Sequence, residues 1–447
     1  MKSILSLALL LAVTVHAADD SSPSKPNVIY LLADDLGHED VGWRNPAIKT
    51  PNLDKLANSG AKLEQYYVQP VCSPTRAAFL TGRYPFRHGL QTGVVRPWAQ
   101  YGLPLEERTI ATALKEAGYE TAITGKWHVG HFQPEYLPTR RGFDHQYGHY
   151  NGALDYFTHE RDGGFDWHKN DTVNRDQGYS TELIGKEASR LIRERDKSKP
   201  LFLYVPFNGV HSPFQVPERY LSLYPQFEGN RKNYAGMISA LDDAVGEIVK
   251  AANESGLGEN TLIVFSSDNG GPNPGKLSDN GKLRAGKGST YEGGVRAIAF
   301  ANWPARIKAG TTVRQPIHIA DWYPTLVKLS GSTAEQKLPV DGHDISAVLT
   351  ESATLPNREI VHNLTPDGGA IRVGDWKLVV STRGAQPKTE LFNLAEDISE
   401  KNDLSTSQPE KVRELRERLD ALAKEAVAPK SKPKPASFKS PAIWGES

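Results

Sequence analysis

The chain has 447 residues and carries 53 basic and 53 acidic side chains, so its formal net charge is zero. A chain of this length can bury a large apolar core and can hold up to about three domains. The balanced charge argues against a polybasic nucleic-acid binder. Affinity for an anionic partner must therefore come from a local cluster of cations.

The first residues have the pattern of a secretory signal peptide. Lys2 supplies a positive charge, residues 4–15 are almost wholly apolar, and the tripeptide 15–17 approximates a cleavage site. We therefore predict a signal peptide at 1–17 and a mature protein that is periplasmic or secreted. No later apolar run is long enough to span a membrane, although an uncleaved anchor is an alternative interpretation of the first one.

Two carboxylates follow the first long apolar run of the mature chain. Residues 27–33 are continuously apolar after Asn27, and Asp34 and Asp35 come directly after them. This pattern predicts a buried parallel strand whose carboxyl end carries polar groups. Open α/β sheets bind ligands at that edge, although two aspartates could equally cap a following helix.

The only cysteine of the chain lies in a Cys-x-Pro-x-Arg pattern. It spans Cys72 to Arg76, and Leu-Thr-Gly-Arg follows at 80–83. We predict a short helix at 51–60 and a second helix that begins at Cys72. The N-terminus of a helix presents N–H groups and partial positive charge to an anion. A lone cysteine is more often a small buried apolar residue than a catalyst, and it cannot form an internal disulfide.

Lys126 and His128 follow the next predicted strand, 119–124, which a helix at 109–118 precedes. Residues two apart on an extended segment point to the same face. Most lysines and histidines are solvated surface groups, but their place between two glycines after a strand favours a functional site. The aromatic, His-rich loop at 147–167 is either packed structure or a surface that stacks on sugar rings.

A helix at 180–195 and a strand at 201–205 lead to His211. Taken alone, His211 is a hydrogen-bonded loop histidine, but its position beyond a strand favours a functional role. A helix at 234–254 then leads to a second long apolar strand, 261–267.

That second strand ends in Asp268 and Asn269, as the first ends in Asp34 and Asp35. Two such strand ends can meet at one edge of a sheet. Carboxylate and amide oxygens suit a hard cation such as calcium rather than zinc. The carboxylates would repel one another strongly, so a bound ion is the simplest resolution.

The rest of the chain contains one further motif and then a segment whose pattern predicts a different kind of structure. Lys287 lies in a glycine-rich loop that has neither a Walker nor a dinucleotide fingerprint. Stretches 370–380 and 390–394 predict a small antiparallel sheet, against which a helix with an apolar stripe would pack. We predict a catalytic domain at 18–337, a C-terminal α+β subdomain at 338–428 and a disordered Lys/Pro-rich tail at 429–447.

These motifs resemble the type I sulfatases, and within that family the N-acetylgalactosamine-4-sulfatase branch. The resemblance covers residues 27–404 and rests on the Cys72 pattern and on four further segments: 31–37, 137–144, 210–213 and 291–296. It implies an α/β, alkaline phosphatase-like fold. In that fold a large mixed sheet lies between helices, and a small C-terminal antiparallel sheet carries a helix.

The resemblance also implies the chemistry and its cofactors. A separate maturation enzyme would oxidise Cys72 to Cα-formylglycine, whose hydrate attacks the sulfur of a sulfate ester. The calcium ligands implied are Asp34, Asp35, oxidised Cys72, Asp268 and Asn269. The catalytic residues implied are Cys72, Arg76, Lys126, His128, His211 and Lys287.

Each catalytic residue has an implied role. Arg76 would hold the hydrate, and Lys126 and Lys287 would bind sulfate oxygens. His128 would take a proton from the sulfated intermediate, and His211 would be the general acid for the leaving sugar oxygen.

We therefore predict an exported sulfatase for sulfated carbohydrates, such as galactosamine or galactose 4-sulfates. Its expected partners are that substrate and the maturation enzyme, with no nucleic acid and no membrane after cleavage of the signal peptide. The alternatives are a phosphonate or phosphate ester hydrolase of the same superfamily and an inert sulfated-glycan-binding protein.

Overall fold

The structure is a computed structural model that describes residues 25–332, 337–356, 358–382 and 387–446. The predicted signal peptide at 1–17 lies outside the described residues. Within the described part of the chain, no helix is both long and apolar enough to cross a bilayer.

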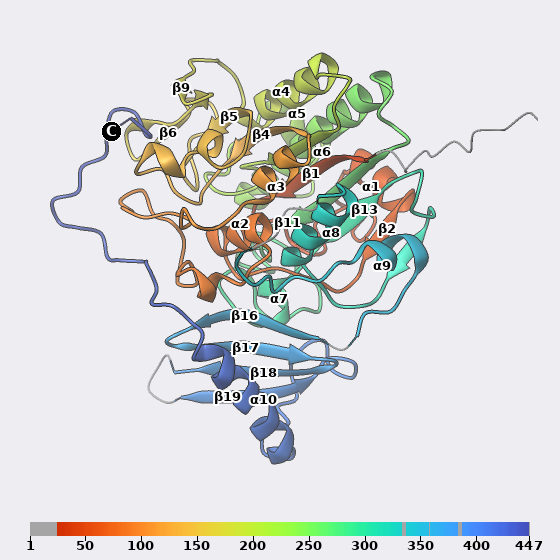
Figure 1. The fold of residues 1–447 in the computed structure, drawn as a ribbon, viewed down its shortest axis with the longest axis vertical. Helices are drawn as coiled ribbons and strands as arrows, with labels where there is room; N and C mark the ends of the chain where they lie inside the picture. The colour runs from red at the N-terminus through yellow and green to blue at the C-terminus, as the bar shows by residue number, and fades with distance from the viewer. Residues whose placement is uncertain (1–24, 333–336, 357, 383–386, 447) are drawn as a thin grey trace, which may run out of the picture.

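One mixed sheet of ten strands organises the described chain, with helices on both of its faces (Figure 1). The strands, in spatial order, are β14 (Thr311–Val313), β2 (Ala61–Leu63), β13 (Ala299–Asn302), β11 (Thr261–Ser267), β1 (Asn27–Ala33), β10 (Leu201–Pro206), β4 (Glu120–Lys126), β5 (His145–His149), β8 (His168–Lys169) and β9 (Thr172–Val173). From β11 to β5 the neighbours are parallel, and antiparallel pairs flank them. The sheet confirms the α/β fold that the sequence predicts.

The central strand β1 is buried on both faces, which explains its continuous apolar sequence. Its even-numbered residues, such as Tyr30, pack into one core, and its odd-numbered residues, such as Leu31, pack into the other. The helices that pack on the Tyr30 side are α2 (Cys72–Thr81), α3 (Ile110–Glu116) and α8 (Trp322–Leu329). Those on the Leu31 side are α1 (Pro51–Asn58), α4 (Ser180–Glu194) and α6 (Gly229–Glu254).

The helices agree closely with the sequence prediction, except that α6 begins at Gly229 rather than at the predicted residue 234. The remaining short elements are α5 (Glu218–Leu221), α7 (Glu292–Val295), α9 (Ser346–Glu351), β3 (Tyr66–Tyr67), β6 (Glu160–Arg161), β7 (Gly164–Phe165), β12 (Arg296–Ala297) and β15 (Ile317–His318).

The C-terminal subdomain is a four-stranded antiparallel sheet with one helix packed on it (Figure 1). Its elements are β16 (Glu359–Thr365), β17 (Gly368–Val373), β18 (Trp376–Ser381), β19 (Lys388–Asn393) and α10 (Pro409–Ala423). Leu415 and Leu419 of α10 pack on the sheet. The stretch predicted at 370–380 is in fact a hairpin, because the chain turns at Gly374 with a φ of 58°.

A buried ion cluster joins this subdomain to the main sheet. Lys377 of β18 lies 2.8 Å from a carboxylate oxygen of Glu292 in α7 and 2.9 Å from one of Glu400. Helix α9 belongs to the main core, since Val348 and Leu349 pack there. The packing therefore favours a domain boundary after α9 rather than at residue 338.

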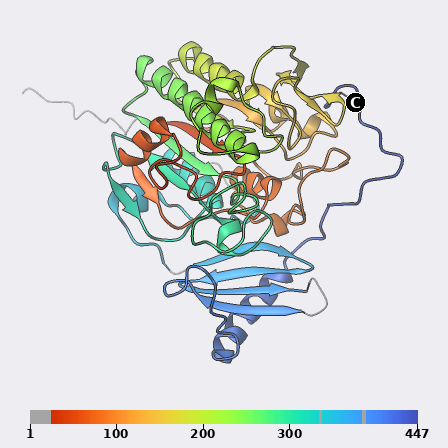
Figure 2. The same cartoon turned by 180° about the vertical axis from the view of Figure 1, so that it is seen from behind.

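The tail takes a defined path in the structure, where we predicted disorder. Figures 1 and 2 show it leaving α10, running along the side of the molecule and ending close to β6. Trp444 is 3% exposed, and its ring N–H donates to the carbonyl of Arg161 at 2.8 Å. The prediction of disorder rested on the Lys/Pro-rich composition and did not take account of three apolar residues. These are Phe438, Ile443 and Trp444, which pack the tail against the catalytic domain.

Candidate active site

The two predicted strand ends meet at one edge of the sheet. Strands β1 and β11 are parallel neighbours and end level with each other. The N–H of Asp268 donates to the carbonyl of Ala33 at 3.0 Å, and the Asn269 amide donates to Asp35 at 2.7 Å. Asp34, Asp35, Asp268 and Asn269 are all buried at this edge.

Cys72 is the first residue of α2, as predicted, and points at these carboxylates. Its Sγ lies 3.5 Å from Oδ1 of Asp34 and 3.6 Å from Oδ1 of Asn269, and the residue is 1% exposed. Burial, together with the charges of Asp268 and Asp34, raises the pKa of the thiol far above its usual value. The unmodified side chain is therefore a protonated thiol at neutral pH, despite its place at a helix N-terminus.

Arg76, one helical turn after Cys72, ties the two strand ends together. Its Nη2 donates to Asp34 at 3.0 Å and to Asp268 at 2.8 Å, and its Nη1 donates to the carbonyl of Lys126 at 3.1 Å. The guanidinium is fully buried, and the two carboxylates keep it charged. Its planar fork suits this bridging position, which a lysine could not fill in the same way.

Two lysines complete the charge balance of the cluster. Lys126 at the end of β4 donates to Asp34, and Lys287 donates to Asp35 at 2.8 Å. Three carboxylates thus face three cations. The mutual repulsion that we expected to require an ion is already offset by these pairs, so repulsion alone is no argument for a metal.

The carboxyls of Asp34 and Asp268 share Arg76 but differ in their pKa. Burial raises the pKa of Asp268 to about 6, and the nearby charge of Asp34 adds to that effect. Burial also acts on Asp34, but Lys126, His211 and Arg76 together hold its pKa below the usual range. Asp34 therefore carries the more stable negative charge of the two.

His128 lies beside the Cys72 helix but not on an extended segment. Its φ of 60° turns the chain after β4, so the prediction that Lys126 and His128 share a strand face was wrong. The carbonyl of His128 accepts a hydrogen bond from Ser73 at 2.8 Å. Its Nε2 lies 3.1 Å from the carbonyl of Val95, which fixes a proton on Nε2.

The other ring nitrogen of His128 is buried and has no hydrogen-bond partner among the described residues. Burial, followed by the positive charges of Lys126 and Arg76, lowers the pKa of His128 well below its usual value. The neutral ring thus presents an unshared lone pair on Nδ1, which can accept a proton.

His211 follows β10 and faces the same cluster. Its Nε2 lies 3.7 Å from Oδ2 of Asp35, and its side chain is 20% exposed. Its Nδ1 lies 2.6 Å from the carbonyl of Ser212 and therefore carries a proton. Burial lowers the pKa of His211, while Asp35 and Asp34 act to raise it.

Four side chains have potential ligand atoms that all lie within 4.8 Å of one another: Asp34, Asp35, Cys72 and His211. His211 was predicted as an acid rather than as a ligand, and the predicted ligands Asp268 and Asn269 surround this group through the contacts above. Sequence reasoning missed Ser73 and Val95, which position His128. Val95 acts through its backbone, for which the sequence carries no signal, whereas Ser73 acts through its hydroxyl, which donates to the carbonyl of His128 and accepts from the N–H of Val95.

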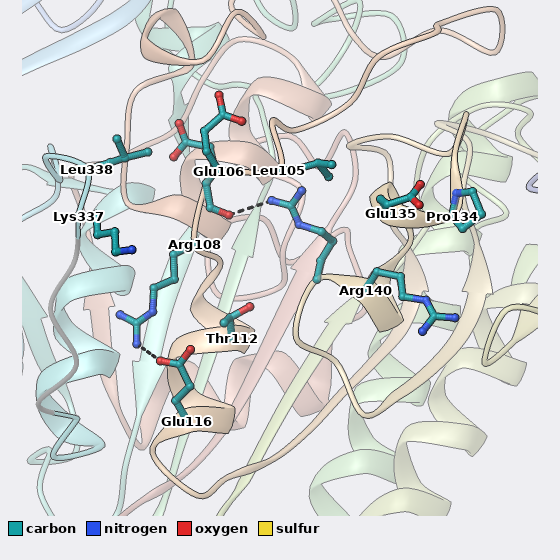
Figure 3. A pocket seen from close by; sticks show the side chains of 12 residues that line it. Leu105, Glu106, Arg108, Thr112, Glu116, Pro134, Glu135, Arg140, Lys337 and Leu338 are labelled. Atoms are coloured by element: carbon teal, nitrogen blue, oxygen red, sulfur yellow. Dashed lines mark hydrogen bonds and ion pairs between the residues drawn. The ribbon is translucent and has the colours of Figure 1, made fainter.

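A cavity of about 850 Å³ lies elsewhere in the molecule, beside α3 (Figure 3). Arg108 and Glu116 form an ion pair along its wall, and Arg140 and Glu135 line the other side. The cavity shares no residue with the cluster around Cys72. Its lining carries both signs of charge and shows no paired nucleophile and base.

A helix N-terminus, paired carboxylates and two lysines at the carboxyl edge of a mixed sheet form the arrangement of an enzyme that acts on anionic esters. The model of the family described as Sulfatase matches residues 26–332, more than half of the chain. The chain therefore belongs to the sulfatase family and is a sulfuric ester hydrolase.

Individual relatives agree with this assignment. The chain is 37% identical to arylsulfatase J of Mus musculus, over 93% of this chain and 79% of that protein. It is 33% identical to N-acetylgalactosamine-6-sulfatase of Mus musculus, over 83% and 74%. A crystal structure of Ps i-CgsB in complex with k-i-k-neocarrahexaose superposes with a TM-score of 0.84 at 33% identity, covering 91% of this chain and 94% of that one.

Proposed function

We propose that this sulfatase is exported and hydrolyses sulfate esters of carbohydrates, with Cys72 oxidised to formylglycine. The observation that carries the proposal is the place of Cys72, buried at a helix N-terminus among Asp34, Asn269 and Arg76. Because its raised pKa keeps the thiol protonated, it is a poor nucleophile, which supports a modified side chain at this position. The hydrate of formylglycine supplies a hydroxyl that can attack the sulfur of the ester.

The residues around Cys72 fit a hard cation. Carboxylate oxygens of Asp34 and Asp35 and the amide oxygen of Asn269 converge on the Cys72 side chain, which offers an oxygen once oxidised. Such a donor set suits calcium better than zinc. We infer that Asp34, Asp35, Asp268, Asn269 and modified Cys72 would hold the ion. A bound calcium supplies positive charge toward the sulfate oxygens.

The lysines supply the remaining positive charge. Lys126 and Lys287 donate to Asp34 and Asp35, so their ammonium groups lie beside the carboxylates that would hold the ion. When Asp34 and Asp35 bind the ion, the lysine N–H groups can donate to sulfate oxygens instead and stabilise the negative charge that develops on them. Arg76 stays between the two strand ends and fixes the positions of Asp34 and Asp268.

The two histidines divide the proton transfers. His128 has a free Nδ1, which makes it the candidate base that takes a proton from the modified Cys72 side chain, while its lowered pKa works against its protonation. His211 is partly exposed, which leaves its ring accessible to a substrate. The carbonyl of Ser212 holds the Nδ1 proton, so His211 can donate a proton from Nε2 to the leaving sugar oxygen only in its doubly protonated form, which Asp35 and Asp34 favour and burial opposes.

The relatives support the proposed class of substrate. They include an N-acetylgalactosamine-6-sulfatase and a protein whose crystal structure is a complex with k-i-k-neocarrahexaose. We infer a sulfated galactose or galactosamine glycan, with the 4-sulfate as the first position to try. The pattern at residues 1–17 supports export to a periplasm or to the medium.

The test combines the mass of one peptide with one assay. The protein is produced with and without a formylglycine-generating enzyme, and the tryptic peptide that contains Cys72 is weighed. Sulfate release is then measured on 4-sulfated galactose and galactosamine saccharides, with Cys72→Ala as the control. Activity that follows the aldehyde content supports the proposal, and full activity of an unmodified thiol form contradicts it.

A further inference from the structure

The C-terminal tail and the loop after Val95 share an aromatic patch. We define the tail patch by five residues: Arg96, Trp98, Lys434, Phe438 and Trp444. The ring centroids of Trp98 and Phe438 lie 6.3 Å apart with their planes at 66°, and those of Phe438 and Trp444 lie 6.3 Å apart with their planes at 18°. Trp444 is buried, whereas Trp98 and Phe438 are only half-buried and keep part of their surface open.

The tail is fixed to the main unit at both ends of this patch. The ring N–H of Trp98 donates to the carbonyl of Lys432 at 3.1 Å. Further along, Ile443 forms a β-bridge with Phe165, and Trp444 donates to Arg161. The half-buried rings are thus held in place rather than carried on a free chain, which lowers the entropy cost of binding to them.

The tail patch adjoins residues that are close in sequence or in contact with His128 of the active site. Val95 donates its N–H to Ser73 at 3.0 Å and accepts a hydrogen bond from His128. Trp98 follows Val95 by three residues, a reach of at most about 11 Å. On the other side of the patch, the His131 ring lies 5.6 Å from the ring of Trp444 and three residues after His128.

The charge of the patch differs from that of the whole chain. Residues 429–446 contain four lysines and a single glutamate, whereas the chain as a whole has a net charge of zero. Lys434 Nζ lies 5.7 Å from the Trp98 ring and 5.5 Å from the Phe438 ring, and Arg96 Cζ lies 5.9 Å from the Trp98 ring. Arg96 and Lys434 are both exposed, so their charges are available to a ligand.

We propose that the tail patch binds a second sulfated sugar unit, next to the unit whose ester is hydrolysed. Trp98 stacks on the apolar face of the sugar ring, Phe438 contacts the edge of that ring, and Arg96 and Lys434 pair with its sulfate. The inference rests on the proposed function and adds that the enzyme prefers an oligosaccharide to a single sulfated sugar. Neutral sugars lack the charge that the patch is built to receive.

Binding is measured in the Cys72→Ala background, so that no turnover occurs and no maturation is needed. The probes are hexasaccharides of κ-carrageenan and of chondroitin 4-sulfate, each beside its chemically desulfated form, in isothermal titration calorimetry. Of the two sulfated hexasaccharides, the one that the Cys72→Ala protein binds more tightly is used to compare variants. We expect Trp98→Ala to weaken its binding about tenfold and Lys434→Gln to weaken it about threefold. Lys439→Gln, which removes an exposed lysine of the same tail outside the patch, is the matched control and should change little.

Kinetics of the matured enzyme separate this inference from the proposed function. The patch variants should raise KM for the hexasaccharide and leave hydrolysis of a small aryl sulfate unchanged. Equal losses on both substrates, or no binding of either sulfated probe, would overturn the tail subsite. The tail subsite would also be overturned if the patch variants released sulfate from hexasaccharides as fast as the wild type does. That result would leave the proposed function intact. If the matured wild type releases sulfate from the aryl ester but from no saccharide, the proposed function itself fails.

Discussion

Arg76 and Asp268 form an ion pair in which neither side chain is exposed to solvent, with Nη2 2.8 Å from Oδ2. Asp34 shares the same guanidinium at 3.0 Å, so one arginine holds the ends of two neighbouring strands. The pair thus serves the fold and the site together. It places the carboxylates opposite Cys72, and it neutralises charge that burial would otherwise make costly.

Replacing Arg76 should destabilise the protein as well as inactivate it. Arg76→Ala leaves two buried carboxylates without their common cation, for which we expect a loss of about 3–5 kcal/mol in the free energy of unfolding. Urea denaturation of the purified variant measures the loss. The matched control is Arg416→Ala, which breaks an exposed ion pair with Asp420 and should cost at most about 1 kcal/mol. Equal losses in the two variants would contradict the role given to Arg76.

Replacing Cys72 should separate activity from stability. Cys72→Ala removes the atom from which the nucleophile is made, so turnover should fall at least about 1,000-fold. The side chain makes only weak sulfur contacts of 3.5 and 3.6 Å, so the free energy of unfolding should change by about 1 kcal/mol. Sulfate release and urea denaturation on the same preparation decide the matter. Retained turnover in the alanine variant would rule out the proposed mechanism.

The long strands and their polar ends could be predicted from the sequence because both signals are local. A run buried on both faces is continuously apolar, as in β1 and β11, and the residue after it lies at the sheet edge whatever its neighbours are. The two-residue strands β8 and β9 carry no periodicity and were not predicted. Strand β16 was missed as well, although it has seven residues.

The parts of the site that escaped prediction depend on contacts distant in sequence. Lys126 pairs with Asp34 across 92 residues, and this charge balance cannot be read from spacing. The turn at His128 needs a positive φ, which histidine adopts only because the surrounding structure holds it. The tail is anchored by Trp444 against Arg161, 283 residues away, and its composition alone indicated disorder.

His211 should matter most for poor leaving groups. His211→Ala should reduce kcat/KM on a sugar sulfate by about 100- to 10,000-fold, because the departing alkoxide then lacks a proton donor. An activated nitrophenyl sulfate needs no such proton and should lose far less. His343→Ala, at a partly buried histidine outside the cluster, is the matched control. Equal losses on both esters would remove the assignment of His211 as general acid.

Calcium should stabilise the folded protein through the cluster at the sheet edge. If the ion binds only the native state, an excess of 100 times its Kd adds about 2.7 kcal/mol to the free energy of unfolding. Treatment with EGTA should therefore lower the Tm of the matured enzyme and its activity, and calcium should restore both.

Asp34→Asn should abolish the calcium-dependent rise in Tm. Asp420→Asn, at an exposed helix position, should keep the full rise. A Tm that does not respond to calcium or EGTA in the matured wild type would contradict the proposed metal site.

Acid should weaken the fold through buried histidines, of which His88 offers a test outside the active site. Its ring is 2% exposed and has no hydrogen-bond partner among the described residues. Burial, with smaller effects from Arg83 and Lys430, lowers its pKa from 6.5 to about 3. Between these values the unfolded chain binds a proton that the folded chain does not, so stability falls as the pH falls, by about 1.4 kcal/mol per pH unit.

His88→Gln removes this proton uptake. Relative to pH 8, the free energy of unfolding at pH 5.5 should fall by about 1.4 kcal/mol less in the variant than in the wild type. Phe86→Leu is the control, because it alters a buried neighbour that does not titrate and should shift stability equally at both pH values. Because the comparison is between pH values, any packing cost of the glutamine cancels. Parallel pH profiles for His88→Gln and the wild type would show that His88 gains its proton equally in the folded and unfolded states.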